Sequence, residues 1–119
     1  MAKILIVDDS RTSRRMLRAV LEEIGYTEIE EAVNGEDGFI KYKEIKPDLV
    51  TMDITMPKLD GIEALELIKK YDADAKVVMI SAAGQREKMF KAIKYGAAEF
   101  ITKPYEKNEV EKIVKGLLD

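Results

Sequence analysis

The 119-residue sequence contains no cysteine and no histidine. The absence of cysteine excludes disulfides, thiolate metal sites and a cysteine nucleophile. The absence of histidine excludes imidazole ligands and histidine-based acid–base catalysis. Any chemistry in this protein must therefore rely on the side chains of Asp, Glu, Lys, Ser or Thr.

Long apolar runs and long runs of one charge are also absent. No apolar run approaches the roughly 18–20 residues that a membrane span needs, and the run at residues 4–7 ends in two aspartates, unlike a signal peptide. The 20 basic and 23 acidic residues leave a net charge of -3, so the basic footprint of a nucleic-acid binder is missing. We therefore expect a cytoplasmic protein that binds neither nucleic acid nor a membrane.

The composition is that of one globular domain. Hydrophobic residues make up 46% of the chain and charged residues 36%, as in an ordinary protein with a real core. A chain of this length closes a single core. Because no linker, repeat or low-complexity segment interrupts it, we predict one domain over residues 1–119.

Short apolar runs alternate with longer amphipathic stretches, which is the pattern of repeated βα units around a parallel sheet. Three runs are continuous and rich in β-branched residues, as strands covered on both faces should be. These central strands are predicted at residues 4–7, 49–52 and 77–80. The stretches 27–32 and 99–102 fit strands nearer the edges.

Helical spacing of apolar residues separates the predicted strands, and capping signals agree with it. Gly25 follows the first helix, Asn34 is placed to cap the second, and Asp60 with Glu63 forms a capping-box pattern before the third. A weaker helix over residues 85–95 ends at Gly96. The fold class is therefore α/β, a doubly wound five-stranded parallel sheet.

Ligands of such sheets bind outside the carboxyl ends of the strands, so the residues just past each strand matter most. These residues are Asp8, Asp9, Asp53, Ser81 and Lys103. Three carboxylates at one edge repel each other and imply a bound cation, and an all-oxygen set favours Mg²⁺, Mn²⁺ or Ca²⁺. Since Mg²⁺ completes its shell with water and phosphate oxygens, the edge suits a phosphate group.

Each residue also has a simpler interpretation. Asp8 and Asp9 fit helix caps, Ser81 fits a cap after a strand, and Lys103 fits a solvated loop lysine. Asp53 is harder to explain in this way, because a buried acid after four apolar or β-branched residues is costly unless it is paired or binds metal. An ammonium at Lys103 can pair with Asp53 and bind a phosphoryl oxygen, and a hydroxyl at Ser81 can donate to the same oxygens.

Four motifs in order resemble the response-regulator receiver domains. They are ILIVDD at residues 4–9, MDITMP at residues 52–57, Ser81-Ala82 and Lys103-Pro104. The resemblance covers the whole chain and is strongest to the CheY-like, stand-alone chemotaxis regulators, because the chain stops after the fifth helix. It implies a flavodoxin-like (βα)5 fold with strand order 2-1-3-4-5 and no output domain; a receiver excised from a larger regulator remains the alternative.

The resemblance also implies a role for each site residue. Asp53 is the phospho-acceptor, Asp9 and Asp53 bind Mg²⁺ or Mn²⁺ directly, and Asp8 acts largely through metal-bound water. The backbone carbonyl of Thr55 completes the protein ligands, and Lys103 contacts the phosphate. Switch roles fall on Ser81 and on Phe100, which stands where the chemotaxis prototype has Tyr. A cis bond between Lys103 and Pro104 is implied, while Thr55 and Ala83 occupy positions that modulate phosphate lifetime.

The implied function is a phosphorelay switch with modest self-catalysis rather than an enzyme. A chemotaxis-type histidine kinase donates the phosphoryl group, and the downstream partner is a motility protein or a phosphatase. The chain is expected to be a monomer and, having no histidine, cannot itself be the phosphohistidine donor. The expected output face lies on the fourth helix, fifth strand and fifth helix, around Lys88, Lys91, Tyr95, Phe100, Tyr105 and Lys107.

Two other functions share this architecture. A haloacid-dehalogenase-type phosphohydrolase places its nucleophile on the first strand with a second acid two residues later, whereas Asp53 lies on the third predicted strand and Thr55 stands at that offset. A flavodoxin-like flavin binder needs a Ser/Thr/Gly-rich phosphate loop after the first strand, where Asp8 and Asp9 would repel the flavin phosphate.

Overall fold

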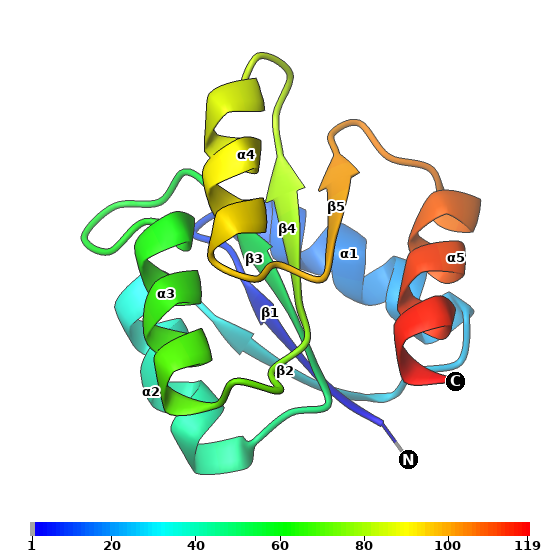
Figure 1. The fold of residues 1–119 in the computed structure, drawn as a ribbon. Helices are drawn as coiled ribbons and strands as arrows, with labels where there is room; N and C mark the ends of the chain where they lie inside the picture. Colours follow the sequence, from blue (N-terminus) through cyan, green and yellow to red (C-terminus); the bar gives the residue numbers. More distant parts are fainter. Residues whose placement is uncertain (1) are drawn as a thin grey trace.

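The computed structural model describes residues 2–119, in which five strands alternate with five helices (Figure 1). In chain order they are β1 (Lys3–Val7), α1 (Arg11–Glu23), β2 (Glu28–Ala32), α2 (Gly35–Ile45), β3 (Leu49–Asp53), α3 (Gly61–Tyr71), β4 (Val77–Ser81), α4 (Arg86–Lys94), β5 (Glu99–Thr102) and α5 (Lys107–Leu118). No helix within the described part is long and apolar enough to cross a membrane.

All strand pairs are parallel, and the strands lie in the order β2-β1-β3-β4-β5. This confirms the predicted fold class and strand order, including the edge positions of the second and fifth strands. Because the strands are parallel, their carboxyl ends meet at one edge of the sheet. The loops that follow β1, β3, β4 and β5 therefore lie next to each other.

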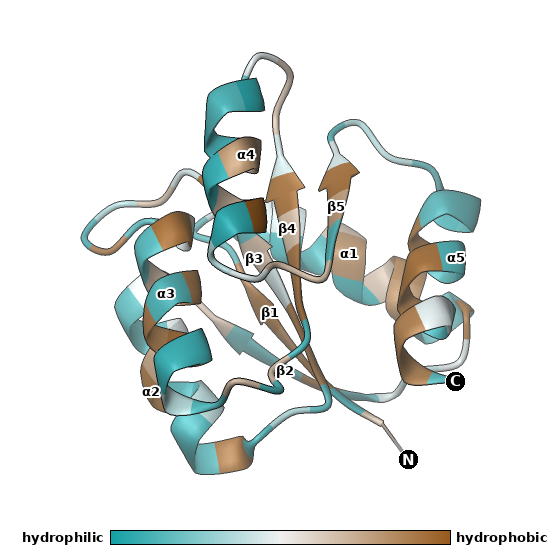
Figure 2. Ribbon diagram, viewed as in Figure 1, coloured by the Kyte–Doolittle hydropathy of each residue, from teal (hydrophilic) through white to brown (hydrophobic). Residues whose placement is uncertain are grey.

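Helices cover both faces of the sheet, and each face has its own core. Helices α2, α3 and α4 pack on one face, around Val50, Met52, Leu65 and Ile68 among others. Helices α1 and α5 pack on the other face, where Leu17, Leu21, Val110 and Val114 meet the strands. In Figure 2 strands β1 and β4 are mostly hydrophobic, whereas the helices show hydrophobic and hydrophilic stretches in alternation. Burial on both faces explains why the central strands read as unbroken apolar runs.

Local sequence signals mark the starts and ends of the helices at the residues that the sequence analysis predicted. The side chain of Asn34 accepts a hydrogen bond from the Asp37 amide at the start of α2, and Asp60 and Glu63 form a complete capping box on α3. Gly25 and Gly96 have positive φ angles of 109° and 93°, a backbone region in which glycine avoids the strain of a side chain. Helix α4 is slightly shorter than predicted, since Gln85 and Tyr95 are its flanking residues.

Candidate functional site

Three carboxylates converge at the carboxyl edge of the sheet. Asp8 and Asp9 directly follow β1, and Asp53 is the last residue of the neighbouring strand β3. Each residue offers one oxygen, and these oxygens all lie within 4.8 Å of one another. Asp8 is buried, Asp53 is partly buried and Asp9 is exposed, so solvent reaches the cluster at Asp9.

The buried Asp8 is held by the start of α1. Its Oδ1 accepts a hydrogen bond from the Ser10 amide at 2.9 Å, while its backbone carbonyl accepts one from the Arg14 guanidinium at 2.8 Å. The N-cap of α1 is Ser10, whose hydroxyl oxygen accepts from the Ser13 amide. Capping of α1 therefore does not account for the position of Asp8 and Asp9. The other Asp8 oxygen, Oδ2, lies 3.4 Å from Lys103 Nζ.

Asp53 is in an unfavourable environment for a carboxylate. Burial and, to a smaller extent, the negative charges of Asp8 and Asp9 together raise the pKa of Asp53 to about 6, although the ammonium of Lys103 acts in the opposite direction. Its side chain is 15% exposed. An acid in such a place gains from any cation that approaches it.

Among the described residues, Lys103 is the cation recorded in ion pairs with the carboxylates of this cluster. Its Nζ lies 3.4 Å from Asp8 Oδ2 and 4.0 Å from Asp53 Oδ1. The backbone amide of Lys103 donates to the Ser81 carbonyl at 2.8 Å, which fixes the loop after β5, and the bond between Lys103 and Pro104 is cis. One ammonium against three carboxylates leaves an excess of negative charge at this edge.

The acidic cluster fits a divalent metal ion by its chemistry. Its donors are all carboxylate oxygens, the ligands of hard cations such as Mg²⁺ and Mn²⁺, and its uncompensated charge is what such an ion would neutralise. Thr55, whose carbonyl the sequence analysis assigned to the metal, lies two residues beyond Asp53, in the loop that follows β3. The cluster could hold a metal.

The loop after Asp53 is shaped by a close approach of two backbone segments. The Gly61 amide donates to the Ile54 carbonyl at 2.8 Å, and a Cβ on Gly61 would lie 2.0 Å from the Asp53 carbonyl oxygen. Only glycine fits at this point, because the obstacle is backbone rather than a flexible side chain. The sequence analysis predicted that the neighbouring Asp60 caps a helix, but it did not predict this role of Gly61.

Ser81 and Phe100 lie toward the α4 side of the sheet. Ser81 is fully buried, and its hydroxyl donates to the Met89 sulfur on α4 at 3.6 Å. Phe100 is partly buried and packs against the core formed with α2, α3 and α4. In this structure the Ser81 hydroxyl is thus directed to α4 rather than to the carboxylates.

The residues expected on the output face lie on α4, β5 and the segment after it. Lys88 and Lys91 are exposed on α4, Tyr95 is its C-cap, and Lys107 opens α5 with its ammonium 3.7 Å from Glu23. Burial raises the pKa of Tyr105. Two exposed apolar residues also lie on α4 and were not singled out from the sequence, namely Phe90 and Ile93, which are 65% and 54% exposed. Their only signal in the sequence was a helical position off the apolar stripe.

A second residue that sequence reasoning missed is Gln85, which it treated only as the start of a helix. The Gln85 Oε1 accepts from the Ala82 amide at 2.7 Å, and its Nε2 donates to Thr55 Oγ1 at 2.5 Å. A glutamine in a loop carries no periodic or motif signal, so only the structure reveals this bridge between two loops at the carboxyl edge.

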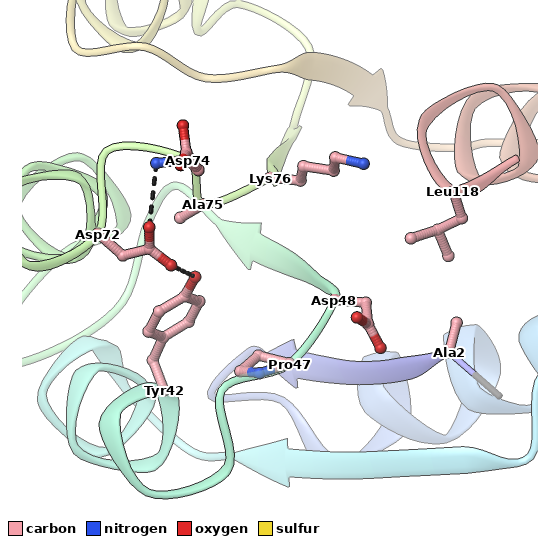
Figure 3. Close-up of a pocket in the computed structure, with 9 residues that line it drawn as sticks. All are labelled: Ala2, Tyr42, Pro47, Asp48, Asp72, Asp74, Ala75, Lys76 and Leu118. Atoms are coloured by element: carbon pink, nitrogen blue, oxygen red, sulfur yellow. Dashed lines mark hydrogen bonds between the residues drawn. The ribbon is translucent and has the colours of Figure 1, made fainter.

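A hollow of about 530 Å³ lies at the opposite, amino edge of the sheet (Figure 3). Acids line this hollow too, and two of them, Asp48 and Asp72, accept hydrogen bonds. The Tyr42 hydroxyl donates to Asp72 Oδ2 at 2.8 Å, and the Asp74 amide donates to Asp72 Oδ1 at 3.0 Å. The hydrogen bond from Tyr42 lowers the pKa of Asp72, and the one from Asp74 adds to this effect.

Comparison with known proteins gives consistent results. The family model for the response regulator receiver domain matches residues 4–115. The chemotaxis protein CheY of Bacillus subtilis is 46% identical over 117 residues, which cover 98% of both chains. The chemotaxis protein CheY of Halobacterium salinarum is 49% identical over 119 residues, covering 99% of this chain and 98% of the relative.

Solved structures agree with these relatives. The CheX–CheY–BeF3–Mg²⁺ complex from Borrelia burgdorferi contains a chain that matches with a TM-score of 0.92 at 38% identity, over 99% of this chain and 90% of that one. The receiver domain of NtrX from Brucella abortus matches with a TM-score of 0.92 at 31% identity, over 98% of both chains.

Proposed function

Because the chain belongs to the response regulator receiver family and is of the type found in CheY chemotaxis proteins, we propose that Asp53 accepts a phosphoryl group from a partner histidine kinase. Proteins of this type are signalling proteins rather than conventional enzymes. The phosphorylated chain changes its affinity for a downstream protein of chemotaxis in the cytoplasm. The chain acts as a monomer and binds the downstream protein through its own surface.

The observation that carries this proposal is the environment of Asp53. Its carboxylate is partly buried, lies within 4.8 Å of the Asp8 and Asp9 ligand atoms and has a pKa raised to about 6. Carboxylates crowded in this way are expensive in a merely structural role. They are useful where a cation and a phosphate group must be gathered at one point.

Asp8, Asp9, Asp53 and the Thr55 carbonyl would hold Mg²⁺, for which Mn²⁺ can substitute. When bound, the ion neutralises charge on the carboxylates and on phosphate oxygens, which otherwise repel each other. Asp53 then attacks phosphorus in line: an O–P bond forms, the bond from phosphorus to the donor nitrogen breaks, and its electron pair leaves with the histidine. The chain itself supplies modest catalysis by positioning these groups.

Lys103 and Ser81 respond to the new charge. A phosphoryl group adds nearly two negative charges and three strong acceptor oxygens. The Lys103 ammonium, 4.0 Å from Asp53, binds one of these oxygens as a compact cation. Ser81 exchanges the Met89 sulfur, a weak acceptor, for a phosphoryl oxygen.

Movement of Ser81 transmits the signal to the output face. Ser81 and Phe100 both lie toward α4, so space vacated near Ser81 admits the Phe100 ring and changes packing around Lys88, Lys91, Tyr95, Tyr105 and Lys107. A partner then distinguishes the two states by a coupling of about 1–3 kcal/mol, which is typical of allostery. The solved complex of a CheY chain with CheX supports binding of a phosphatase or motility protein by this chain.

Intact-mass analysis after incubation with acetyl phosphate and Mg²⁺ tests the proposal. Wild-type protein should gain one phosphoryl group, which alkali or hydroxylamine removes because it is an acyl phosphate. Asp53→Asn should gain none, because an amide nitrogen is not a nucleophile for this attack. Equal labelling of Asp53→Asn, or undiminished labelling of the wild type in excess EDTA, would contradict the assignment.

A further inference from the structure

The side chain of Gln85 joins two loops that border the acidic cluster. One end of its amide accepts the Ala82 N–H of the β4–α4 loop at 2.7 Å, and the other donates to the Thr55 hydroxyl of the β3–α3 loop at 2.5 Å. Gln85 is also the N-cap residue of α4, yet its side chain makes no capping bond to that helix. Both of its functional ends are therefore used to connect the loops.

The Ala82 amide faces the side of β4 on which Asp53 lies. In a parallel sheet, backbone groups of successive residues turn to opposite neighbouring strands. The Ile80 carbonyl accepts from the Ile54 amide beyond β3, and the Ser81 carbonyl accepts from the Lys103 amide beyond β5. The Ala82 N–H, one residue further, turns again toward β3. Its acceptor there is the Gln85 side chain rather than backbone.

A phosphoryl group on Asp53 would compete for this donor. Its charged oxygens accept stronger hydrogen bonds than an amide carbonyl does. If the Ala82 N–H donates to phosphate instead, Gln85 loses its bond to Ala82. Its remaining bond to Thr55 then no longer ties Ala82 to the β3–α3 loop. The bridge thus belongs to the unphosphorylated arrangement of the two loops.

We infer that Gln85 is a positioning residue that restrains the β4–α4 loop in the unphosphorylated state and is released when Asp53 is phosphorylated. This inference rests on the proposed function. A contact made in one state only shifts the equilibrium by its own free energy. The Gln85 bonds restrain the loop more than the bond between Ser81 and Met89 does, because a thioether sulfur is a weak acceptor.

The affinity of the Mg²⁺-loaded protein for beryllofluoride, a stand-in for the phosphoryl group, measures this restraint. Gln85→Ala removes both bonds and should bind beryllofluoride about five- to tenfold more tightly, as expected for the loss of one or two ordinary hydrogen bonds from the resting state. Gln85→Asn should do the same, because its amide is one carbon too short to reach both partners. Thr55→Val should give part of the gain.

The double variant Gln85→Ala, Thr55→Val tests whether the two residues act through one contact. It should bind beryllofluoride no more tightly than Gln85→Ala alone, since the Thr55 hydroxyl has already lost its partner. Tyr42→Phe serves as a control for stability, because it removes a hydrogen bond at the far edge of the sheet. It should lower the midpoint of thermal unfolding without changing beryllofluoride affinity.

Hydrogen exchange of the Ala82 amide gives a second readout on the metal-free protein. Ala82 is exposed, so its amide is protected only while it is bonded to Gln85, and Gln85→Ala should remove that protection. Unchanged protection, or beryllofluoride binding that is equal or weaker in Gln85→Ala, overturns the inference. Failure of wild-type protein to bind beryllofluoride or to be labelled on Asp53 overturns the proposed function and this inference with it.

Discussion

Both edges of the sheet carry aspartates, but the electrostatic environments of these aspartates are opposite. At the amino edge, Asp72 receives hydrogen bonds from Tyr42 and Asp74, and its pKa is lowered. At the carboxyl edge, Asp53 is partly buried and lies near the charges of Asp8 and Asp9, and its pKa is raised to about 6. An aspartate that accepts hydrogen bonds stabilises the fold, whereas aspartates that cluster together need a bound cation to offset their repulsion.

The contrast predicts that substitutions at the two edges differ in kind as well as in size. An acid at the carboxyl edge should matter for ligand binding and cost stability. An acid at the amino edge should matter for stability and leave ligand binding unchanged. Three measurements test this difference.

The largest effect is expected for Mg²⁺ binding. Asp9→Asn should raise the Mg²⁺ dissociation constant at least about 30-fold, or about 2 kcal/mol, because it removes both a ligand and its charge. Asp8→Asn should have a smaller effect if Asp8 acts through metal-bound water. Asp72→Asn, the matched change at the amino edge, should leave the constant unchanged in a calorimetric titration. Equal losses at Asp9 and Asp72 would show that the edges do not differ in this respect.

The next effect concerns stability without metal. Asp53→Asn should raise the free energy of unfolding by about 1–2 kcal/mol at about pH 7.5 in EDTA, because it removes a poorly solvated charge. The folded-state pKa of Asp53 lies above its ordinary value of 3.8, so the folded state holds this proton more strongly. That stabilisation is present at low pH and is lost as pH rises through about 6.

The gain from Asp53→Asn should consequently shrink as pH falls from about 6 and approach zero below the ordinary pKa of 3.8, where Asp53 is protonated in both the folded and the unfolded wild type. Urea unfolding of both proteins across this pH range measures the difference. A gain that is constant with pH would assign it to packing and not to the charge of Asp53.

The smallest effect is expected at the amino edge. Tyr42→Phe keeps the ring and its edge-to-face contact with Tyr71 but removes the hydroxyl that donates to Asp72, and should cost about 1 kcal/mol of stability. Phosphoryl labelling of Asp53 should be unchanged. Adding Asp72→Asn should cost little more, since the shared bond is already gone, and a fully additive double variant would show that the pair does not interact.

The fold was largely predictable because its signals are local. Strands covered on both faces must be apolar along their whole length, so residues 49–52 and 77–80 could be recognised without any tertiary information. Asn34 and Asp60 cap the starts of helices through hydrogen bonds to the residue three positions further along the chain. The strand order, in contrast, came from the family resemblance, because periodicity does not say which strands are neighbours.

The residues around the site were predictable by position but not by orientation. Strand ends placed Asp8, Asp53 and Lys103 at one edge, because parallel strands finish together. Nothing in the sequence indicated that Lys103 lies closer to Asp8 than to Asp53, or that the Ser81 hydroxyl is directed to Met89. Such details depend on which rotamer packing allows, and that is decided by residues distant in the sequence.

The strand order also has a consequence for the time at which the pocket forms during synthesis. The first strand, β1, lies between β2 and β3, so it can complete its pairing only after residue 53 has left the ribosome. From then on the sheet grows at a single border, with β4 and then β5 added in turn. All three aspartates lie in the first half of the chain, whereas Lys103 lies near its end. The ammonium of Lys103 is therefore synthesised after the carboxylates that it contacts, and its ion pairs with Asp8 and Asp53 can form only when β5 has joined the sheet.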